Sequence, residues 1–235
     1  MVARVSIIIP CLNEGAVIES LLTSLQPMRE CGHEVIVVDG GSRDDTVERA
    51  APWVDQLLRS PAGRAGQMTV GADAAEGDIF WFLHADTALP DSADRLILEG
   101  METTRKGWGR FDVTLSGKHP MLRVVEWMMN LRSRLSGIAT GDQGIFVSRP
   151  LFLQSGGFPN IPLMEDIALS KKLKQTGLPL CLKHRLTTSS RRWEQGGILR
   201  TIGLMWRLRL AYALGSDPKV LAARYRQCSS PTQNS

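Results

Sequence analysis

The sequence predicts an α/β protein whose mostly parallel central sheet is flanked by helices. In the first half, short runs rich in β-branched residues alternate with segments of helical periodicity, as parallel strands joined by crossover helices do. Acidic residues follow two of the runs: Asp39 ends VIVVD, and Asp86 ends IFWFLHAD. Ligands of open parallel sheets bind at the carboxyl ends of the strands, so these carboxylates are expected to meet in one cleft.

The expected elements follow from these patterns in chain order. Strands are predicted at residues 5–9, 34–38, 56–58, 78–83, 111–115, 144–147 and 180–182. Helices are predicted at residues 17–25, 64–75, 93–103, 122–135 and 167–175. Ser42 and Asp45 resemble a capping arrangement at the start of one further helix. The chain is predicted to divide into three parts. These are one domain over residues 1–195, a basic amphipathic helical extension over 196–227 and a disordered tail over 228–235.

Charge is distributed unevenly along the 235 residues. Residues 1–182 carry 18 basic and 22 acidic side chains, whereas residues 183–235 carry 10 basic and 2 acidic ones. Such a cationic segment can meet phosphate groups, anionic lipid or nucleic acid. No nucleic-acid reader motif accompanies it, so nucleic acid is not an expected partner.

Cysteine usage and hydropathy indicate the compartment. Cys11, Cys31, Cys181 and Cys228 include no CxxC pair, which disfavours a metal knuckle or a disulfide framework and predicts free thiols in a reducing cytosol. We see no signal peptide and no window of 18 uninterrupted apolar residues. The chain is therefore expected to be cytoplasmic, with peripheral contact at the inner face of the membrane left open.

Two loops after predicted strands carry candidate ligand-binding residues. Pro10 ends the first strand, and Asn13 and Glu14 follow it, where they could hold a base or ribose; a helix entry capped by Asn13 is the equal alternative. Asp39 is followed by a glycine pair, and Gly41 precedes a helix whose free N–H groups favour anions. A carboxylate that ends an apolar strand favours function there. The pattern is not GxGxxG, so a dinucleotide fingerprint is not supported.

Three further residues fit a phosphate or metal site. Arg64 opens a predicted helix and could contact a diphosphate, although a solvated arginine is the favoured interpretation when this residue is taken alone. Asp86 could bind Mg²⁺ or Mn²⁺, because hard divalent ions take oxygen ligands and share the phosphates of their substrate. His84 could touch the metal or the ribose, or it could be a satisfied, partly buried imidazole.

Glu165 and Asp166 open a later helix. Acidic residues in the first helical turn are stabilised by the helix dipole, which explains the pair without any function. The functional interpretation is a general base that removes a proton from an attacking hydroxyl. The residues alone leave both interpretations open.

Taken together, the motifs resemble a known family. IIIPCLNE, VIVVDGGSRDDT, GRAGQ, FLHADT and MEDIALSKKL, in this order and spacing, are similar to family-2 glycosyltransferases of the GT-A fold over roughly residues 4–195. TGDQGIFV, with the short chain, looks like the small branch found beside radical-SAM enzymes and labelled arsenosugar-biosynthesis glycosyltransferases.

The resemblance implies roles for individual residues. Asp166, next to Glu165, would be the catalytic base, and Asp86 would bind the metal, Mg²⁺ or Mn²⁺. A nucleotide-diphosphate sugar, most often a UDP-sugar in this family, would be bound by Pro10, Asn13, Glu14, Asp39, Gly41, Arg64, His84, Arg192 and Trp193. An acceptor, either a small molecule or a lipid-linked one, would lie near Gly141, Asp142 and Gln143.

Two departures from the family pattern bear on mechanism. His84 replaces the usual first Asp of the DxD motif, and Ser189 replaces the Gln of QxxRW. The second departure argues against a processive, polymer-making enzyme. The expected reaction is therefore a single, metal-assisted transfer with inversion at the anomeric carbon. The alternatives are a nucleotidyltransferase, whose Gly-rich basic loop PCLNEG does not offer, and a non-catalytic module that binds nucleotide sugars or membrane surfaces.

The C-terminal extension has an apolar stripe at helical spacing. It consists of Ile198, Ile202, Leu204, Met205, Leu208, Ala211 and Tyr212. This pattern favours packing on the domain or on a second subunit, as in a homodimer. The alternative is an amphipathic helix that lies on an anionic membrane, with contact through residues 198–227.

Overall fold

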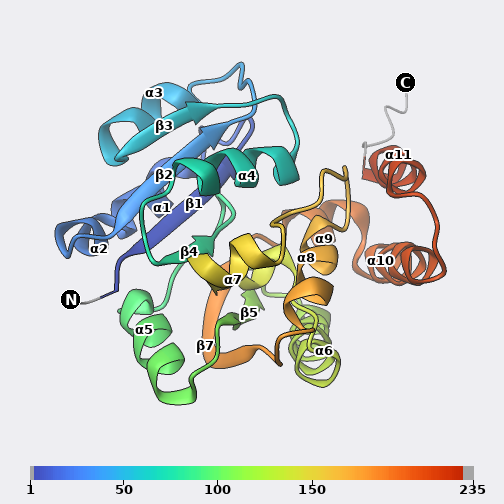
Figure 1. Cartoon of the computed structure of the whole chain (residues 1–235). Helices are drawn as coiled ribbons and strands as arrows, with labels where there is room; N and C mark the ends of the chain where they lie inside the picture. The colour runs from blue at the N-terminus through green and yellow to red at the C-terminus, as the bar shows by residue number, and fades with distance from the viewer. Residues whose placement is uncertain (1–2, 230–235) are drawn as a thin grey trace.

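The computed structural model describes residues 3–229, without the side chains of Arg192, Gln195 and residues 226–229 (Figure 1). Most of the tail predicted to be disordered, residues 230–235, lies outside the described residues. The chain forms one seven-stranded sheet with helices on both faces (Figure 1). Among residues 3–229, none of the helices combines the length and the apolar character needed to span a bilayer.

The sheet is mostly parallel, as predicted. Its order is β3-β2-β1-β4-β6-β5-β7, and only β6 runs antiparallel to its neighbours β4 and β5. The strands are β1 (Val5–Cys11), β2 (Glu34–Asp39), β3 (Gln56–Arg59), β4 (Ile79–Phe82), β5 (Trp108–Leu115), β6 (Phe146–Ser148) and β7 (Leu180–Thr188).

The helices of the first half are α1 (Ile18–Ser24), α2 (Gln26–Glu30), α3 (Thr46–Ala50), α4 (Arg64–Ala74) and α5 (Ala93–Thr104). The second half contributes α6 (Pro120–Ser136), α7 (Arg149–Gln154), α8 (Glu165–Leu173), α9 (Arg191–Gly196), α10 (Ile198–Ala213) and α11 (Pro218–Ser229). Two short 3₁₀ turns are η1 (Ala51–Trp53) and η2 (Gly141–Gln143).

The core explains why the first strands read as continuous apolar runs. Every residue of β1, β2 and β4 is buried, because helices cover both faces of this parallel part of the sheet. One face of β1 packs in a cluster with α1 and α5 and the other with α4. Both faces of the strands are therefore mostly apolar, and the buried polar residues Ser6, Glu34 and Asp39 lie near the strand termini.

Two local expectations differ from the structure. The short strand predicted at residues 180–182 is nine residues long, because β7 pairs with β5 along its whole length across a bulge at Phe111/Asp112. Ser42 does not cap α3, whose N-cap residue is Asp45 and which has no side-chain cap. The hydroxyl of Ser42 instead accepts a hydrogen bond from the Asn13 N–H at 2.9 Å.

The basic C-terminal extension packs on the rest of the chain. Ile198 and Ile202 contact a cluster formed by β5 and α6, and Leu208 is buried with α8 and α11 residues. The apolar stripe is thus turned inward, as the packing interpretation predicted. On the outer side of the molecule, α10 and α11 form a helical pair beside the sheet (Figure 1).

Candidate functional site

The strand ends of the parallel half meet at one edge of the sheet. Cys11, the last residue of β1, lies beside Asp39, the last residue of β2. The Gln67 amide of α4 donates to the Cys11 and Val38 carbonyls, both at 2.8 Å, and so ties the helix to both strand ends. The segment after β4 joins the same edge, since the Leu83 N–H donates to the Ile8 carbonyl at 3.0 Å.

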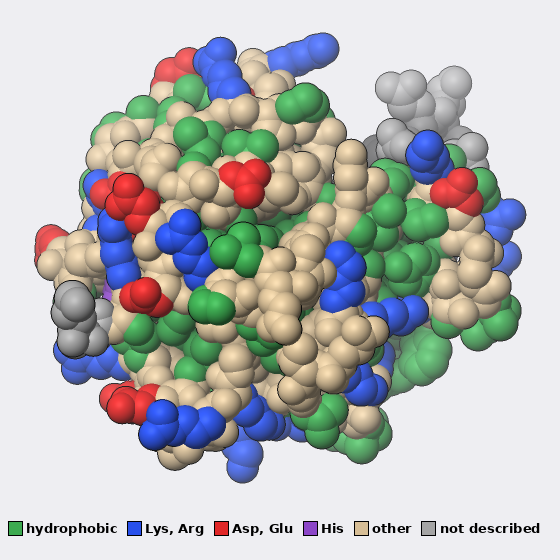
Figure 2. All heavy atoms as spheres, in the orientation of Figure 1, with side chains coloured by type: hydrophobic (Ala, Val, Ile, Leu, Met, Phe, Trp, Pro, Cys, Tyr) green, Lys and Arg blue, Asp and Glu red, His purple; other side chains and the backbone are tan. Residues whose placement is uncertain are grey.

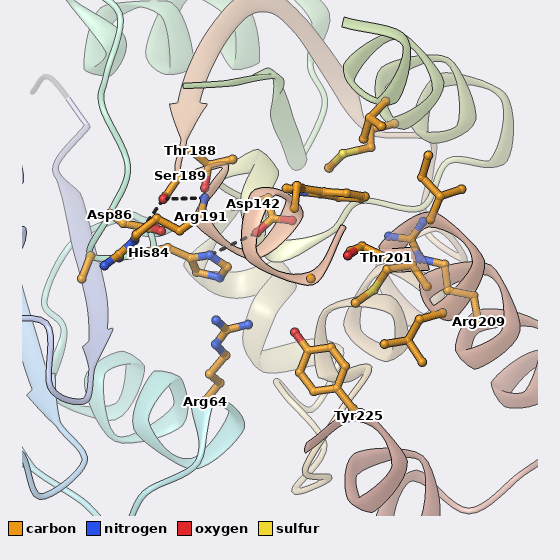
Figure 3. A pocket seen from close by; sticks show the side chains of 18 of the residues that line it. Arg64, His84, Asp86, Asp142, Thr188, Ser189, Arg191, Thr201, Arg209 and Tyr225 are labelled. Atoms are coloured by element: carbon orange, nitrogen blue, oxygen red, sulfur yellow. Dashed lines mark hydrogen bonds and ion pairs between the residues drawn. The ribbon is translucent and has the colours of Figure 1, made fainter. Parts of the chain in front are cut away.

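A cavity of about 1090 Å³ opens at this edge (Figure 3). Its walls come from the loops after β1 and β4, from α4 and α6, and from the segment 188–225. The predicted site residues that line it are Pro10, Glu14, Arg64, His84, Asp86, Asp142 and Trp193. Residues remote in the sequence therefore share one chamber of the size that a nucleotide sugar and an acceptor require.

Carboxylates and cations alternate near the strand ends. The Glu14 carboxylate lies 3.7 Å from an Arg191 guanidinium nitrogen. Burial and then the charge of Asp86 raise the pKa of Glu14, while Arg191 and Arg64 oppose this shift. Asp86 has no hydrogen-bond or ion-pair partner among the described side chains and lines the cavity. Its oxygens therefore remain available to a ligand.

Arg64 brings positive charge to the same chamber from the first turn of α4. Its guanidinium reaches into the cavity (Figure 3). Loss of hydration inside the cavity lowers the pKa of Arg64, but the charges of Glu165, Asp142 and Asp166 outweigh this loss and raise that pKa, although the side chain as a whole stays exposed. Arg64 thus stays charged beside the amino end of a helix, an arrangement that favours phosphate.

His84 is held by the η2 turn. Its Nδ1 lies 3.3 Å from the Asp142 carboxylate, as the dashed line in Figure 3 marks. A side chain at Gly141 would come within 2.6 Å of the His84 ring, so glycine is needed for the turn to approach. His84 therefore connects the β4 end to the turn that carries the predicted acceptor residues.

Asp166 ties that turn to α8. Its carboxylate accepts from the Gly141 N–H at 2.8 Å and from its neighbour Ile167 N–H at 2.7 Å. Asp166 is half-buried and lies outside the cavity lining, but it is bonded next to the lining residue Asp142, and its charge acts on both Arg64 and Arg132. Glu165 is buried, and burial followed by the charge of Asp166 raises the pKa of Glu165.

Asp39 and Gly41 line a second, smaller pocket of about 460 Å³ rather than the large cavity. The Asp39 carboxylate accepts from the Gly41 and Ser42 N–H groups at 3.0 and 3.1 Å. Cys11 lines the large cavity, and its sulfur lies 4.0 Å from an oxygen of Asp39, which lines the smaller pocket. The single cleft expected from the sequence is therefore two adjoining chambers.

Two predicted contact residues serve the loops instead of the cavity surface. Asn13, at a φ of 54°, accepts from the Arg43 N–H at 2.8 Å and does not cap α1, which begins at Ile18. Gln143 is fully buried, and its carbonyl accepts from the Thr140 N–H at 3.2 Å. Both side chains fix backbone turns next to the site.

The sequence interpretation missed much of the outer wall. Arg191 lines the cavity beside Trp193, whereas the side chain of the predicted Arg192 lies outside the described residues. Other cavity residues not predicted are Arg132, Arg200, Thr201, Arg209 and Tyr225. A signal existed for the first of them, because Arg132 continues the helical spacing of the apolar α6 residues Val125, Met128 and Met129.

Cys11 is not a nucleophile at neutral pH. Burial, followed by the charges of Asp39, Glu14 and Asp44, raises the pKa of the Cys11 thiol to about 12. The thiol therefore stays protonated at neutral pH. Among residues 3–229, no three His, Cys, Asp or Glu side chains are grouped so as to hold a metal ion by themselves.

Comparisons with known proteins agree with this geometry. Residues 6–148 match the model of the family "Glycosyl transferase family 2". The poly-beta-1,6-N-acetyl-D-glucosamine synthase of Staphylococcus aureus is 22% identical to this chain over 92% of its length. The synthase of the same name from Staphylococcus epidermidis is 24% identical over 94%. The chain spans about half the length of these curated relatives, 55% and 56% respectively.

Solved structures share the fold. S. aureus TarS has a TM-score of 0.66 at 19% identity, covering 80% of this chain and 61% of its own. Glucosyl-3-phosphoglycerate synthase from Mycobacterium tuberculosis, in complex with Mn²⁺, uridine-diphosphate and glucosyl-3-phosphoglycerate, has a TM-score of 0.57 at 25% identity, covering 79% and 71%. The sheet order, the strand-end carboxylates and the match over residues 6–148 agree, and the chain belongs to glycosyltransferase family 2, with the GT-A fold.

Proposed function

We propose that this enzyme transfers a sugar from a UDP-sugar to an acceptor hydroxyl, with inversion and one sugar per encounter. One observation carries the proposal: Glu14, Asp86, Arg64 and Arg191 line a single cavity. Asp166 bonds to the Gly141 N–H, next to the lining residue Asp142. Cations and a metal-binding carboxylate suit a diphosphate, and a nearby carboxylate suits a base. TarS with UDP-GlcNAc and the mycobacterial synthase with Mg²⁺ and uridine-diphosphate support the choice of donor.

The chemistry of the donor set fits a divalent ion. Asp86 offers hard oxygen atoms to the cavity, without a partner among the described residues and next to Glu14. One carboxylate suffices when the diphosphate and water supply the other ligands. Bound Mg²⁺ or Mn²⁺ would neutralise charge on the leaving diphosphate. Asp86 would hold it, with Glu14 close by.

The chain's own residues supply the remaining steps. Arg64 and Arg191 orient the diphosphate and stabilise the negative charge that grows as it leaves. Asp166 takes the proton of the acceptor hydroxyl, whose oxygen attacks from the face opposite the nucleotide. The Gly141 and Ile167 N–H groups hold the Asp166 carboxylate in one orientation for this step.

Asp142 is the rival base, because it lines the cavity directly and contacts His84. The test compares Asp166→Asn with Asp142→Asn in a UDP-sugar transfer assay with Mn²⁺. Loss of transfer in the first variant, with UDP binding retained in a thermal-shift assay, supports the assignment. Loss only in Asp142→Asn reassigns the base.

We propose transfer of a single sugar, although the curated relatives are named as synthases of a polymer. Ser189 stands where the QxxRW motif has Gln, and its hydroxyl accepts from the Arg191 N–H and Nε at 3.2 Å. Ser189 thus positions Arg191 rather than a growing chain. Mass spectrometry of products should show one added sugar, and a ladder of products would reject this part. The narrower placement beside radical-SAM enzymes, from TGDQGIFV, stays a prediction.

We further propose that the outward face of α10 contacts an anionic membrane. This face carries the exposed residues Leu199, Leu210 and Leu214. Apolar surface gathers around the α10–α11 pair in Figure 2, with Lys and Arg side chains beside it. Apolar and cationic groups together suit anionic lipid.

Vesicles of phosphatidylglycerol and phosphatidylcholine test this contact. The chain should co-sediment with them but not with phosphatidylcholine alone, and Leu199→Ser/Leu210→Ser should stay in the supernatant. Size-exclusion chromatography without lipid addresses the homodimer. If the wild-type chain is a dimer and Leu199→Ser/Leu210→Ser is a monomer, this face of α10 contacts a second copy of the chain instead of a membrane.

A further inference from the structure

The cavity has two chemically different halves. The inner half is made by strand ends and α4 and holds Glu14, Arg64 and Asp86. The outer half is made by α6 and α10, where every residue that faces the chamber is apolar, hydroxyl-bearing or cationic. These residues are Val125, Met128, Met129, Arg132, Arg200, Thr201, Ile202, Leu204, Met205, Trp206 and Arg209. Figure 3 shows Thr201 and Arg209 across the chamber from Asp86 and His84.

Helical spacing brings the cations of this outer half together. Arg132 follows Val125 and Met129 on one face of α6, and Arg209 follows Thr201 and Met205 on one face of α10. The two helices are in contact. The charge of Arg209 acts on Arg132, and after burial it is the largest cause of the lowered pKa of Arg132, about 10.

These two arginines lack partners among the described residues. The Nε and one terminal nitrogen of Arg132 are buried, and their N–H groups donate to no described oxygen. Arg209 makes no hydrogen bond or ion pair with any described side chain. Leaving buried N–H groups of a cation unpaired is costly, and placing a second cation beside it adds repulsion. Such an arrangement is stable in the loaded enzyme when an anion bridges the pair.

The nearby carboxylates do not fill this role. Asp166 attracts Arg132 but forms no ion pair with it: each Asp166 oxygen accepts one backbone N–H, of Gly141 or of Ile167, and keeps a lone pair for the acceptor proton. Asp142 also attracts Arg132, and it contacts His84 on the inner side of the chamber. The donor diphosphate has its own cations in the inner half. An anion in the outer half therefore belongs to the second substrate.

We propose that Arg132 and Arg209 bind an anionic group, phosphate or carboxylate, of the sugar acceptor. This inference rests on the proposed function and names its acceptor class. Asp166 accepts from the Gly141 N–H, next to Asp142 in the wall of the same chamber. An acceptor anchored by its anion at Arg132 thus binds in the chamber that the base adjoins. The apolar side chains around the pair favour an anion attached to a hydrocarbon portion.

Calorimetric titration of the full chain, loaded with UDP and Mn²⁺, tests this with three probes. Octyl phosphate carries both features, glycerol 3-phosphate only the anion, and octyl glucoside only the tail. We expect octyl phosphate to bind. Arg132→Met and Arg209→Met should weaken it roughly tenfold or more, the usual effect of losing a charged hydrogen-bond partner. Arg207→Met, the same charge change on the exposed side of α10, should stay within about twofold.

The probes also distinguish the source of the anion. Equal binding of glycerol 3-phosphate assigns a soluble acceptor, and binding of octyl phosphate alone assigns an amphiphilic one. The proposal is overturned if no anionic probe binds. It is also overturned if octyl glucoside binds as well as octyl phosphate, or if Arg207→Met weakens binding as much as Arg209→Met.

Donor binding is measured in the same variants by the thermal shift with UDP. Arg132→Met and Arg209→Met should keep the wild-type shift, which also shows that they fold, and Arg132→Lys should partly restore binding of octyl phosphate. If UDP binding falls as it does in Arg64→Met, the arginines hold the donor and the acceptor assignment fails. If wild type shows no shift with UDP, the proposed function fails, whatever the phosphate probes show.

Discussion

The inner and outer halves of the cavity are built in different ways. The inner half stands on strand ends, where Asp86 and Glu14 sit at fixed positions relative to a buried sheet. The outer half stands on α6 and α10, which meet only through tertiary packing. Functional residues at strand ends can be recognised from short sequence motifs. The residues of a cavity wall built from helix faces are instead spread over distant parts of the sequence. The halves therefore differ in what they bind and in how they are recognised.

The largest effect is expected at the boundary between the halves. Asp166→Asn should lower transfer roughly 10²–10⁴-fold, the usual contribution of a general base. UDP binding should change little, because the inner half is intact. Initial rates with a UDP-sugar, together with UDP thermal shifts, measure both. Transfer at the wild-type rate would remove Asp166 from the reaction.

Metal dependence should be confined to the inner half. In the wild-type protein, Mn²⁺ should increase the rise in melting temperature that UDP produces. This increase should be absent in Asp86→Asn and in wild-type protein treated with EDTA. Asp73→Asn, on the exposed side of α4, is the matched control. A Mn²⁺ effect that survives in Asp86→Asn would place the ion on other ligands.

The two halves can be separated by one kind of substitution. Arg64→Met should weaken UDP binding about tenfold, as expected for a lost charged contact, whereas Arg209→Met should leave it within about twofold. Isothermal titration with UDP and Mn²⁺ compares them. An equal loss of UDP affinity in both variants would show that the nucleotide contacts both halves of the cavity, and the two halves would then not be separate binding sites.

A smaller effect concerns stability at the start of α8. The folded state raises the pKa of Glu165 above its unfolded value, chiefly by burial and then by Asp166. As pH rises through the unfolded pKa, the unfolded chain loses its proton more readily, so stability falls until the folded pKa is passed. Glu165→Gln has no titratable carboxyl group at this position, so its stability should not fall in this way as the pH rises.

Melting curves between pH 4 and pH 8 measure this difference. The two proteins should melt alike at the acid end, and the variant should melt higher at pH 8. Each ~1 kcal/mol corresponds to about 2–4 °C for a chain of this size. A gap that closes as pH rises would contradict the assignment.

The smallest effect is chemical. Iodoacetamide at pH 8 should label the exposed Cys31 and spare Cys11, whose thiol is buried and whose pKa is raised to about 12. Peptide mass spectrometry quantifies both sites. Rapid labelling of Cys11 would show that the wall between the two chambers opens readily.

The sequence predicted the parallel half of the fold well. β1, β2 and β4 lie where their apolar runs indicate, since strands buried on both faces have an unambiguous pattern. β7 was underestimated, because Lys183, His184 and Arg185 interrupt the apolar run in an exposed part of the strand. Its pairing with β5, rather than its composition, makes that segment a strand.

At the site, prediction succeeded where a side chain follows a strand directly. Glu14, His84 and Asp86 reach the cavity from such positions. Asn13 and Gln143 look equally polar in sequence, yet their side chains bind neighbouring backbone groups. Whether a polar residue in a loop faces a ligand or its own turn depends on backbone direction, which short motifs do not encode.

By itself, the sequence determined the alternation of strands and helices, the acidic strand ends and the cationic C-terminal segment, because these depend on local periodicity and composition. Only the tertiary structure decided that Asp39 occupies an adjoining chamber and that Arg132 and Arg209 share one wall. The physical reason is that long-range packing sets which helix faces meet. The two arginines are 77 positions apart, and nothing local to either of them specifies the other.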